Sequence, residues 1–122
     1  MQYLLVDANH LASRCRFAQV NDLARSDGER TGVLYGVIKG TAYAKNLMSI
    51  QGFQVIMFWD AGRAARRVEL CPEYKSNRTK ESPTEQEIKE KRSYFEQIGL
   101  CQEALRKVGI RQVQVPGCEA DD

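Results

Sequence analysis

Hydrophobic and polar positions along this chain predict strands that alternate with helices. Strands are predicted at residues 3–7, 54–60 and 111–115, and the first of them is a short continuous apolar run. Such runs are typical of strands in a parallel sheet covered on both faces. Helical segments are predicted between them at 10–20, at 31–51 and from about residue 83 to Gly109. This order predicts an α/β fold, a parallel sheet with flanking helices.

The segment 31–51 has the spacing of an amphipathic helix that ends at Gly52. Its predicted buried face consists of Leu34, Val37, Ile38, Thr41, Ala44 and Met48. Gly32, Gly36 and Gly40 are spaced four residues apart, which predicts a close approach to another element.

The last predicted helix has a clear start signal. Ser82-Pro83-Thr84-Glu85 matches a capping box with proline at the first helical position. The apolar face expected to pack against the sheet consists of Ile88, Phe95, Ile98, Cys101, Leu105 and Val108.

Two polar segments lie between these elements. Residues 21–31 carry turn-forming and charged residues, so we expect an exposed loop. Residues 61–80 contain six basic side chains against two acidic ones, with little apolar material, so we expect a mobile basic segment.

Composition restricts the class of protein. Hydrophobic residues make up 43% and charged residues 28% of 122 residues, as in a globular domain with one core. The chain has neither a long apolar run nor a basic, apolar leader, so we expect a cytoplasmic protein without a membrane partner. Four dispersed cysteines and a single histidine indicate reduced thiols and no structural zinc.

Acidic residues follow all three predicted strands. Asp7 and Asp60 close the first two strands, and Glu119, Asp121 and Asp122 follow the third. Because the carboxyl ends of parallel strands form one crevice, five carboxylates there would repel one another unless a cation neutralised them. Mg²⁺ and Mn²⁺ prefer such oxygen ligands, and two ions together can promote phosphodiester cleavage. Taken singly, each acidic residue is equally typical of a helix cap or a turn.

The basic segment directly after Asp60 can complement this acidic cluster. Lysine and arginine there would hold phosphates, and Tyr74 beside Lys75 offers a ring for base stacking. Alone, the segment is equally compatible with a solvated charge run. His10 is a weaker candidate for a general base, and packing near the first strand is its more common role.

Three stretches resemble the 5′-nuclease family, which comprises flap endonucleases, phage 5′–3′ exonucleases and the N-terminal nuclease domain of bacterial DNA polymerase I. They are Leu5-Val6-Asp7-Ala8-Asn9, Phe58-Trp59-Asp60 and Pro116-Gly117-Cys118-Glu119-Ala120-Asp121-Asp122. Arg67 with Pro72-Glu73-Tyr74-Lys75-Ser76-Asn77-Arg78 resembles the family's R-x₄-P-x-Y-K-x₂-R stretch. The resemblance covers nearly the whole chain.

The resemblance implies that residues 1–122 form the N-terminal part of a PIN-like, Rossmann-like 5′-nuclease domain, with an arch-like basic segment at about 61–82. It implies Mg²⁺- or Mn²⁺-dependent hydrolysis of DNA with 5′ ends, flaps or single-stranded/duplex junctions, and in some members of RNA in RNA–DNA hybrids. Such activity belongs to the bacterial or phage-infected cytoplasm. By position, the metal ligands would be Asp7, Asp60, Glu119, Asp121 and Asp122. Arg67, Tyr74, Lys75 and Arg78 would contact DNA, with Lys75 and Arg78 at the scissile phosphate.

This sequence departs from the family pattern in three places. Cys118 replaces an aromatic or aliphatic residue, and Gly62-Arg63-Ala64-Ala65 lacks the family's proline. The chain also stops before a further aspartate pair and a DNA-gripping helical element. We therefore expect a sheet incomplete at the C-terminus, an incomplete second metal site and weak or absent activity of the isolated chain. A PIN-type ribonuclease and a non-catalytic DNA-binding fragment remain alternatives.

Overall fold

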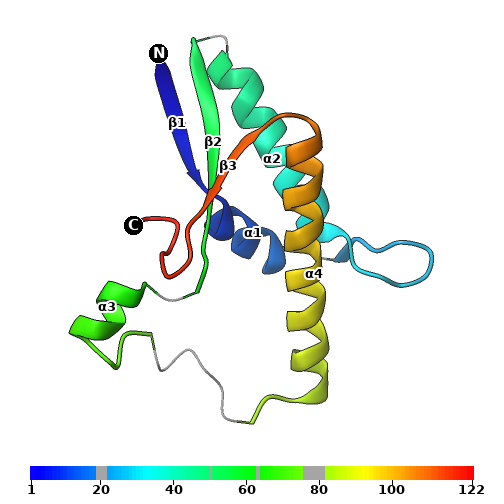
Figure 1. The fold of residues 1–122 in the computed structure, drawn as a ribbon. Coiled ribbons are helices and arrows are strands. Elements are labelled where there is room, and N and C mark those ends of the chain that lie inside the picture. The colour runs from blue at the N-terminus through cyan, green and yellow to red at the C-terminus, as the bar shows by residue number, and fades with distance from the viewer. Residues whose placement is uncertain (19–21, 50, 63, 76–81) are drawn as a thin grey trace.

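The computed structural model describes residues 1–18, 22–49, 51–62, 64–75 and 82–122. The described chain runs in the order β1 (Gln2–Asp7), α1 (Ala8–Arg16), α2 (Gly32–Ser49), β2 (Phe53–Trp59), α3 (Ala65–Leu70), α4 (Glu85–Lys107) and β3 (Arg111–Gln114) (Figure 1). The alternation of strands and helices is therefore the predicted one, and the fold is α/β.

The three strands form one parallel sheet in the order β1-β2-β3. Leu5 of β1 pairs with Ile56 of β2, and Phe58 pairs with Val113 of β3. The central strand β2 is the most buried, with Met57 fully buried and Trp59 only 2% exposed. All three carboxyl ends therefore meet at one edge of the sheet, as the sequence predicted.

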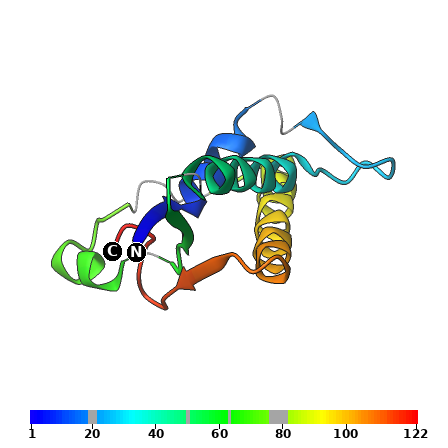
Figure 2. The ribbon, with the colours of Figure 1, turned by 90° about the horizontal axis from the view of Figure 1, so that it is seen from above.

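The main core lies on one face of this sheet, where α1, α2 and α4 pack (Figure 2). The expectation that the first strand is covered on both faces is wrong. In β1 only Leu4 and Val6 pack against the core, whereas Tyr3 and Leu5 are 43% and 63% exposed. The reason is that an edge strand alternates its side chains between two faces, and the described helices cover only one of them.

Helices α1 and α2 approach each other closely. A β-carbon placed on Gly40 would lie 3.3 Å from the Leu11 side chain, so the close packing predicted from the glycine spacing is confirmed at Gly40. Helix α1 begins at Ala8, two residues before the predicted start, because the Asp7 carboxylate accepts a hydrogen bond from the backbone N–H of His10 at 2.9 Å.

The start and the buried face of α4 differ from the prediction. Thr84, not Ser82, is the N-cap, and its hydroxyl oxygen accepts a hydrogen bond from the Glu87 N–H at 3.2 Å. Several residues expected to be buried are exposed, and two others replace them. Ile88, Phe95 and Val108 are 47%, 55% and 67% exposed, whereas Tyr94 and Gln97 are 8% and 4% exposed.

Gln97 is buried because it caps another helix. Its side-chain oxygen accepts hydrogen bonds from the backbone N–H groups of Val33 and Leu34 at 2.9 and 3.1 Å. These N–H groups lie in the first turn of α2 and have no partner within their own helix. The contact therefore joins α4 to the beginning of α2.

The basic segment is more ordered than predicted where it is described. It contains the short helix α3, whose first N–H, that of Ala65, donates to the Gly117 carbonyl at 2.7 Å. The loop before α2 is exposed as expected and closes through a bridge between Ala24 and Arg30. Among the described residues, no helix combines the length and apolar character needed to cross a membrane.

Candidate active site

Carboxylates from all three strand ends gather around one open depression of about 330 Å³. Asp7 ends β1, Asp60 follows β2 directly, and Glu119 and Asp121 lie in the turn after β3. The lining residues are Asp7, Asn9, His10, Ser13, Asp60, Lys75, Tyr94, Glu119 and Asp121. Four of the five predicted carboxylates and Lys75 therefore share this depression, while Asp122 lies beside it.

Two hydrogen bonds position Asp60, one made by its backbone and one by its carboxylate. Its own N–H donates to the Asn9 side-chain oxygen at 2.7 Å, and its carboxylate accepts the N–H of Ala120 at 2.7 Å. Burial raises the pKa of Asp60, as do the negative charges of Asp7 and Glu119, against the lowering effect of the Ala120 hydrogen bond. Burial is the largest of these causes, and the positive charge of Lys75 also acts to lower the pKa.

The turn that carries Glu119 is fastened to the chain after β2. Ala61 donates its N–H to the Cys118 carbonyl at 2.9 Å and accepts the Gly117 N–H at 3.3 Å. Gly117 adopts a φ of 76°, and a β-carbon there would lie 3.4 Å from the Ala65 methyl group. Only glycine combines this backbone angle with such close contact at little energetic cost.

Glu119 is 8% exposed and has several hydrogen-bonding partners. Its carboxylate accepts the Ala64 N–H at 3.2 Å and forms an ion pair with Lys75. Burial would raise the pKa of Glu119, but the hydrogen bonds from Lys75 and the other donors outweigh it, so its pKa is lowered. The same contact raises the pKa of Lys75. Glu119 is therefore ionised and already paired with a cationic side chain.

Lys75 reaches Glu119 from a strained backbone. Its φ of 55° is in the left-handed region, which costs roughly 1 kcal/mol for a residue with a β-carbon. The Nζ group also lies 5.1 Å from the centre of the Tyr74 ring. Residues in such conformations persist where the surrounding contacts hold them, often at functional sites.

Arg67 bridges the remaining carboxylates. Its guanidinium lies 2.8 Å from an Asp122 oxygen, 3.6 Å from Asp121 and 3.7 Å from Glu119. It also donates a hydrogen bond to the Tyr74 hydroxyl at 2.8 Å, which with the acidic neighbours raises the pKa of Arg67. Arg67 and Lys75, two of the three basic residues predicted for DNA, thus contact the acidic cluster in this conformation.

Some site residues were not predicted, and one predicted residue is not described. Asn9, Ser13, Tyr94 and the Ala120 N–H contribute to the depression. Asn9 follows Asp7 closely and could have been noticed for that reason, whereas nothing in the sequence distinguishes Tyr94. Arg78, predicted to lie at the scissile phosphate, is outside the described residues.

The donor set suits a hard divalent cation, because every candidate ligand is a carboxylate oxygen. Within the described residues, however, no group of three or more histidine, cysteine, aspartate and glutamate side chains is placed so that it could hold one ion. Three of the five carboxylates are instead paired with cationic side chains: Glu119 with Lys75 and Arg67, and Asp121 and Asp122 with Arg67.

Fold and site together define an α/β protein with an acidic site at the carboxyl edge of a parallel sheet. Comparison with known proteins narrows this class. Residues 2–122 match the family described as 5′-3′ exonuclease, N-terminal resolvase-like domain. The chain belongs to that family.

Relatives of known name agree with this assignment. The chain is 31% identical over 122 residues to DNA polymerase I of Lactococcus lactis subsp. cremoris. It is 34% identical over 119 residues to the thermostable DNA polymerase I of Thermus thermophilus. Each match covers 98% of this chain but only 13% of the relative. The chain therefore corresponds to a small part of these polymerases.

Solved structures share the fold. The 5′-exonuclease of bacteriophage T5 with divalent metal ions (zinc) bound has a TM-score of 0.75 and 22% identity to this chain. The T5 flap endonuclease in a complex with DNA and metal ions has the same TM-score and 24% identity. Both matches cover 99% of this chain and 41% of the phage protein.

Proposed function

We propose that this chain provides the acidic site of a divalent-metal-dependent 5′–3′ exonuclease or flap endonuclease, which hydrolyses phosphodiester bonds in 5′-ended or flapped DNA. One observation carries the proposal. In a chain of the 5′-3′ exonuclease family, carboxylates from three adjacent strand ends share a depression with Lys75. Acidic side chains suit metal ions, and cationic side chains suit the phosphate backbone.

In this proposal Asp7, Asp60, Glu119, Asp121 and Asp122 hold Mg²⁺ or Mn²⁺. A bound ion of this kind lowers the pKa of a water molecule and stabilises the charge on the leaving oxygen. The Asp60 N–H donates a hydrogen bond to the Asn9 side-chain oxygen, and the Asp60 carboxylate accepts one from the Ala120 N–H. These two contacts support Asp60 as a ligand with a defined orientation.

The basic residues have a second role in the same proposal. Lys75 and Arg67, released from the carboxylates, would contact phosphates of the DNA, and the Tyr74 ring would stack against a base. Arg78 is assigned to the scissile phosphate by its motif position alone. The ion pairs of Lys75 and Arg67 hold these side chains within reach of the depression when no substrate is present.

The decisive experiment measures cleavage of a labelled 5′-flap DNA with Mg²⁺ or Mn²⁺, together with Mn²⁺ binding by calorimetry. Asp60→Asn should weaken Mn²⁺ binding and abolish any cleavage that the wild-type chain shows, because it removes a ligand charge without changing side-chain size. Asp27→Asn is the matched control, since Asp27 lies in the exposed loop before α2, and it should change neither.

Two results would contradict the proposal. Mn²⁺ binding and cleavage that are identical in the Asp60→Asn protein would show that the acidic depression is not the metal site. Faster cleavage of an all-RNA flap than of the DNA flap would favour a ribonuclease instead.

A further inference from the structure

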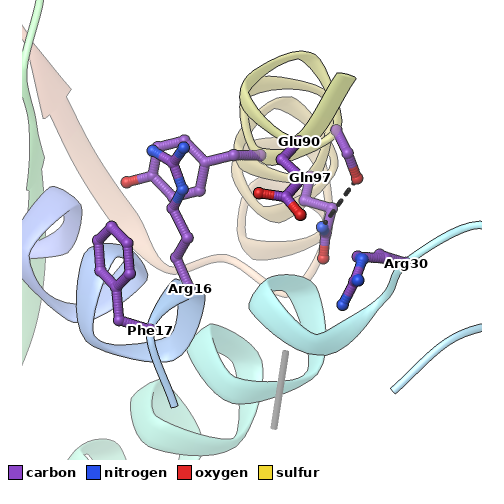
Figure 3. Close-up of a pocket in the computed structure, with 7 residues that line it drawn as sticks. Arg16, Phe17, Arg30, Glu90 and Gln97 are labelled. Atoms are coloured by element: carbon purple, nitrogen blue, oxygen red, sulfur yellow. Dashed lines mark hydrogen bonds between the residues drawn. The ribbon is translucent and has the colours of Figure 1, made fainter. Parts of the chain in front are cut away.

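A second, smaller pocket lies beside the acidic depression, between the end of α1 and the first half of α4 (Figure 3). Its volume is about 100 Å³, and it is lined by Arg16, Phe17, Arg30, Glu90, Ser93, Tyr94 and Gln97. We call it the arginine pocket. Tyr94 lines both the arginine pocket and the acidic depression. The two are therefore neighbours on one surface.

Arg16 is held in place by two aromatic rings. Its guanidinium carbon lies 4.8 Å from the centre of the Tyr94 ring and 5.2 Å from that of Phe17. Both distances are in the range of cation–π attraction. A guanidinium fixed in this way loses little side-chain entropy when it binds an anion, and it stays charged at every physiological pH. Arg16 is therefore a preorganised cation.

The rest of the pocket adds polar groups that suit a phosphate. Arg30 lines the pocket from the loop before α2, on the side opposite Arg16 (Figure 3), and forms an ion pair with Asp22 at 3.8 Å. Ser93 contributes a hydroxyl group that accepts a hydrogen bond from the Gln97 amide at 3.3 Å. Glu90 is the single acidic group in the lining. Its negative charge repels an anion. Removing this charge should therefore strengthen anion binding, whereas removing an arginine should weaken it.

Phe17 adds a feature that a simple anion site does not need. Its side chain is 79% exposed although it is large and apolar. An exposed aromatic ring beside a fixed arginine is a typical stacking surface for a base of a single strand. The nine residues of α1 that separate Asp7 from this ring span about 13 Å at 1.5 Å per residue. That distance corresponds to roughly four phosphates of a stacked strand at about 3.4 Å each.

We propose that the arginine pocket binds a backbone phosphate of the nucleic-acid strand that occupies the acidic depression, with the adjacent base against Phe17. Arg16 and Arg30 donate hydrogen bonds to the phosphate oxygens, and the bound position lies a few nucleotides from the reacting phosphate. This inference rests on the proposed function, because it requires a nucleic-acid strand in the acidic depression. It adds an anchoring contact that holds the strand without taking part in the chemistry.

The test is the salt dependence of DNA binding, measured with the full chain by fluorescence anisotropy on a labelled 5′-flap DNA. Ca²⁺ replaces Mg²⁺, so that hydrolysis is suppressed while a divalent cation remains available to the acidic depression. Arg16→Gln should weaken binding about tenfold at low salt, as expected for loss of a charge-assisted contact. It should also reduce the slope of log K against log salt by about 0.7–0.9, the value for one phosphate contact. Arg30→Gln should act in the same direction, and Glu90→Gln should tighten binding.

Arg106→Gln is the charge-matched control, because Arg106 lies in the last turn of α4, away from the arginine pocket. It should leave the slope unchanged. Circular dichroism of each variant establishes that the fold is intact, and Arg16→Lys, which keeps the charge, should retain the wild-type slope. Should Arg16→Gln not fold, Arg30→Gln and Glu90→Gln still give effects of opposite sign.

The outcomes separate the two proposals. Wild-type binding with unchanged slopes in the folded Arg16→Gln and Arg30→Gln proteins would overturn the arginine pocket and leave the proposed function standing. Absence of DNA binding by the wild-type chain at low salt would overturn both. Slopes reduced in both arginine variants, with Glu90→Gln tighter than wild type, would establish the pocket as a phosphate site.

Discussion

Replacing Gln97 by alanine should destabilise the protein far more than an ordinary substitution on a helix. The Gln97 side-chain oxygen accepts the Val33 and Leu34 N–H groups at 2.9 and 3.1 Å, and the residue is 4% exposed. Alanine would leave the first turn of α2 without these acceptors, and a buried unpaired N–H costs about 1–3 kcal/mol. Because water can reach part of the space left behind, we expect a total loss of about 2–4 kcal/mol.

The assay is urea denaturation followed by far-UV circular dichroism, with the free energy of unfolding obtained by linear extrapolation. Gln86→Ala is the matched control on the same helix, since Gln86 is exposed and donates a hydrogen bond to the Glu90 side chain at 3.1 Å. It should cost less than about 0.5 kcal/mol. Gln97→Glu should recover part of the loss, because a carboxylate also accepts these bonds and its charge suits a helix N-terminus. Equal stabilities of the Gln97→Ala and Gln86→Ala proteins would refute the capping role.

Three further predictions concern the N-cap of α4, the accessibility of two cysteines and the pH dependence of stability. Thr84→Ala should lower the free energy of unfolding by about 1 kcal/mol, whereas Ser82→Ala should leave it nearly unchanged. A larger loss of stability in the Ser82→Ala protein, measured by urea titration, would show that Ser82 is the cap. Maleimide should label the exposed Cys71 in the native protein but not the buried Cys101, as peptide mass spectrometry can establish. Burial raises the pKa of Cys101 from 9.0 to about 12, so the unfolded thiol ionises first and stability should fall as pH rises above 9.0 toward 12. Constant stability over that range would contradict the burial of Cys101.

The order and type of the elements could be predicted because each hydrophobic run is short and sharply bounded. Details of α4 could not. Ser82 and Thr84 are equally good N-caps with acidic residues three positions later, so local chemistry does not choose between them. The spacing of Phe95 and Ile98 predicted which face of α4 is buried. The burial of Tyr94 and Gln97, however, depends on α1 and α2, which pack against these two residues. Helical spacing alone does not determine which other helices pack against α4.

The acidic cluster was predictable because Asp7, Asp60 and Glu119 each follow a strand of a parallel sheet. The ion pairs of Lys75 and Arg67 were not, since they depend on how the chain returns after α3. Sequence spacing placed basic residues near acidic ones but not in contact with them. The arginine pocket was missed for a similar reason. Arg16 and Tyr94 are far apart in the sequence, and neither belongs to the motifs that signalled the site.

The strands occupy the sheet in the order in which a ribosome produces them, β1 then β2 then β3. Each new strand can add to the free edge of the one before it, and domains generally begin folding from their N-terminal part during synthesis. The depression, in contrast, combines residues made early in synthesis with residues made late. The Asp60 carboxylate accepts a hydrogen bond from the N–H of Ala120, sixty residues later. A nascent chain therefore holds a β1–β2 pair long before it holds the carboxylates that follow β3. A chain interrupted during translation before Glu119 lacks these carboxylates even if its first strands have paired.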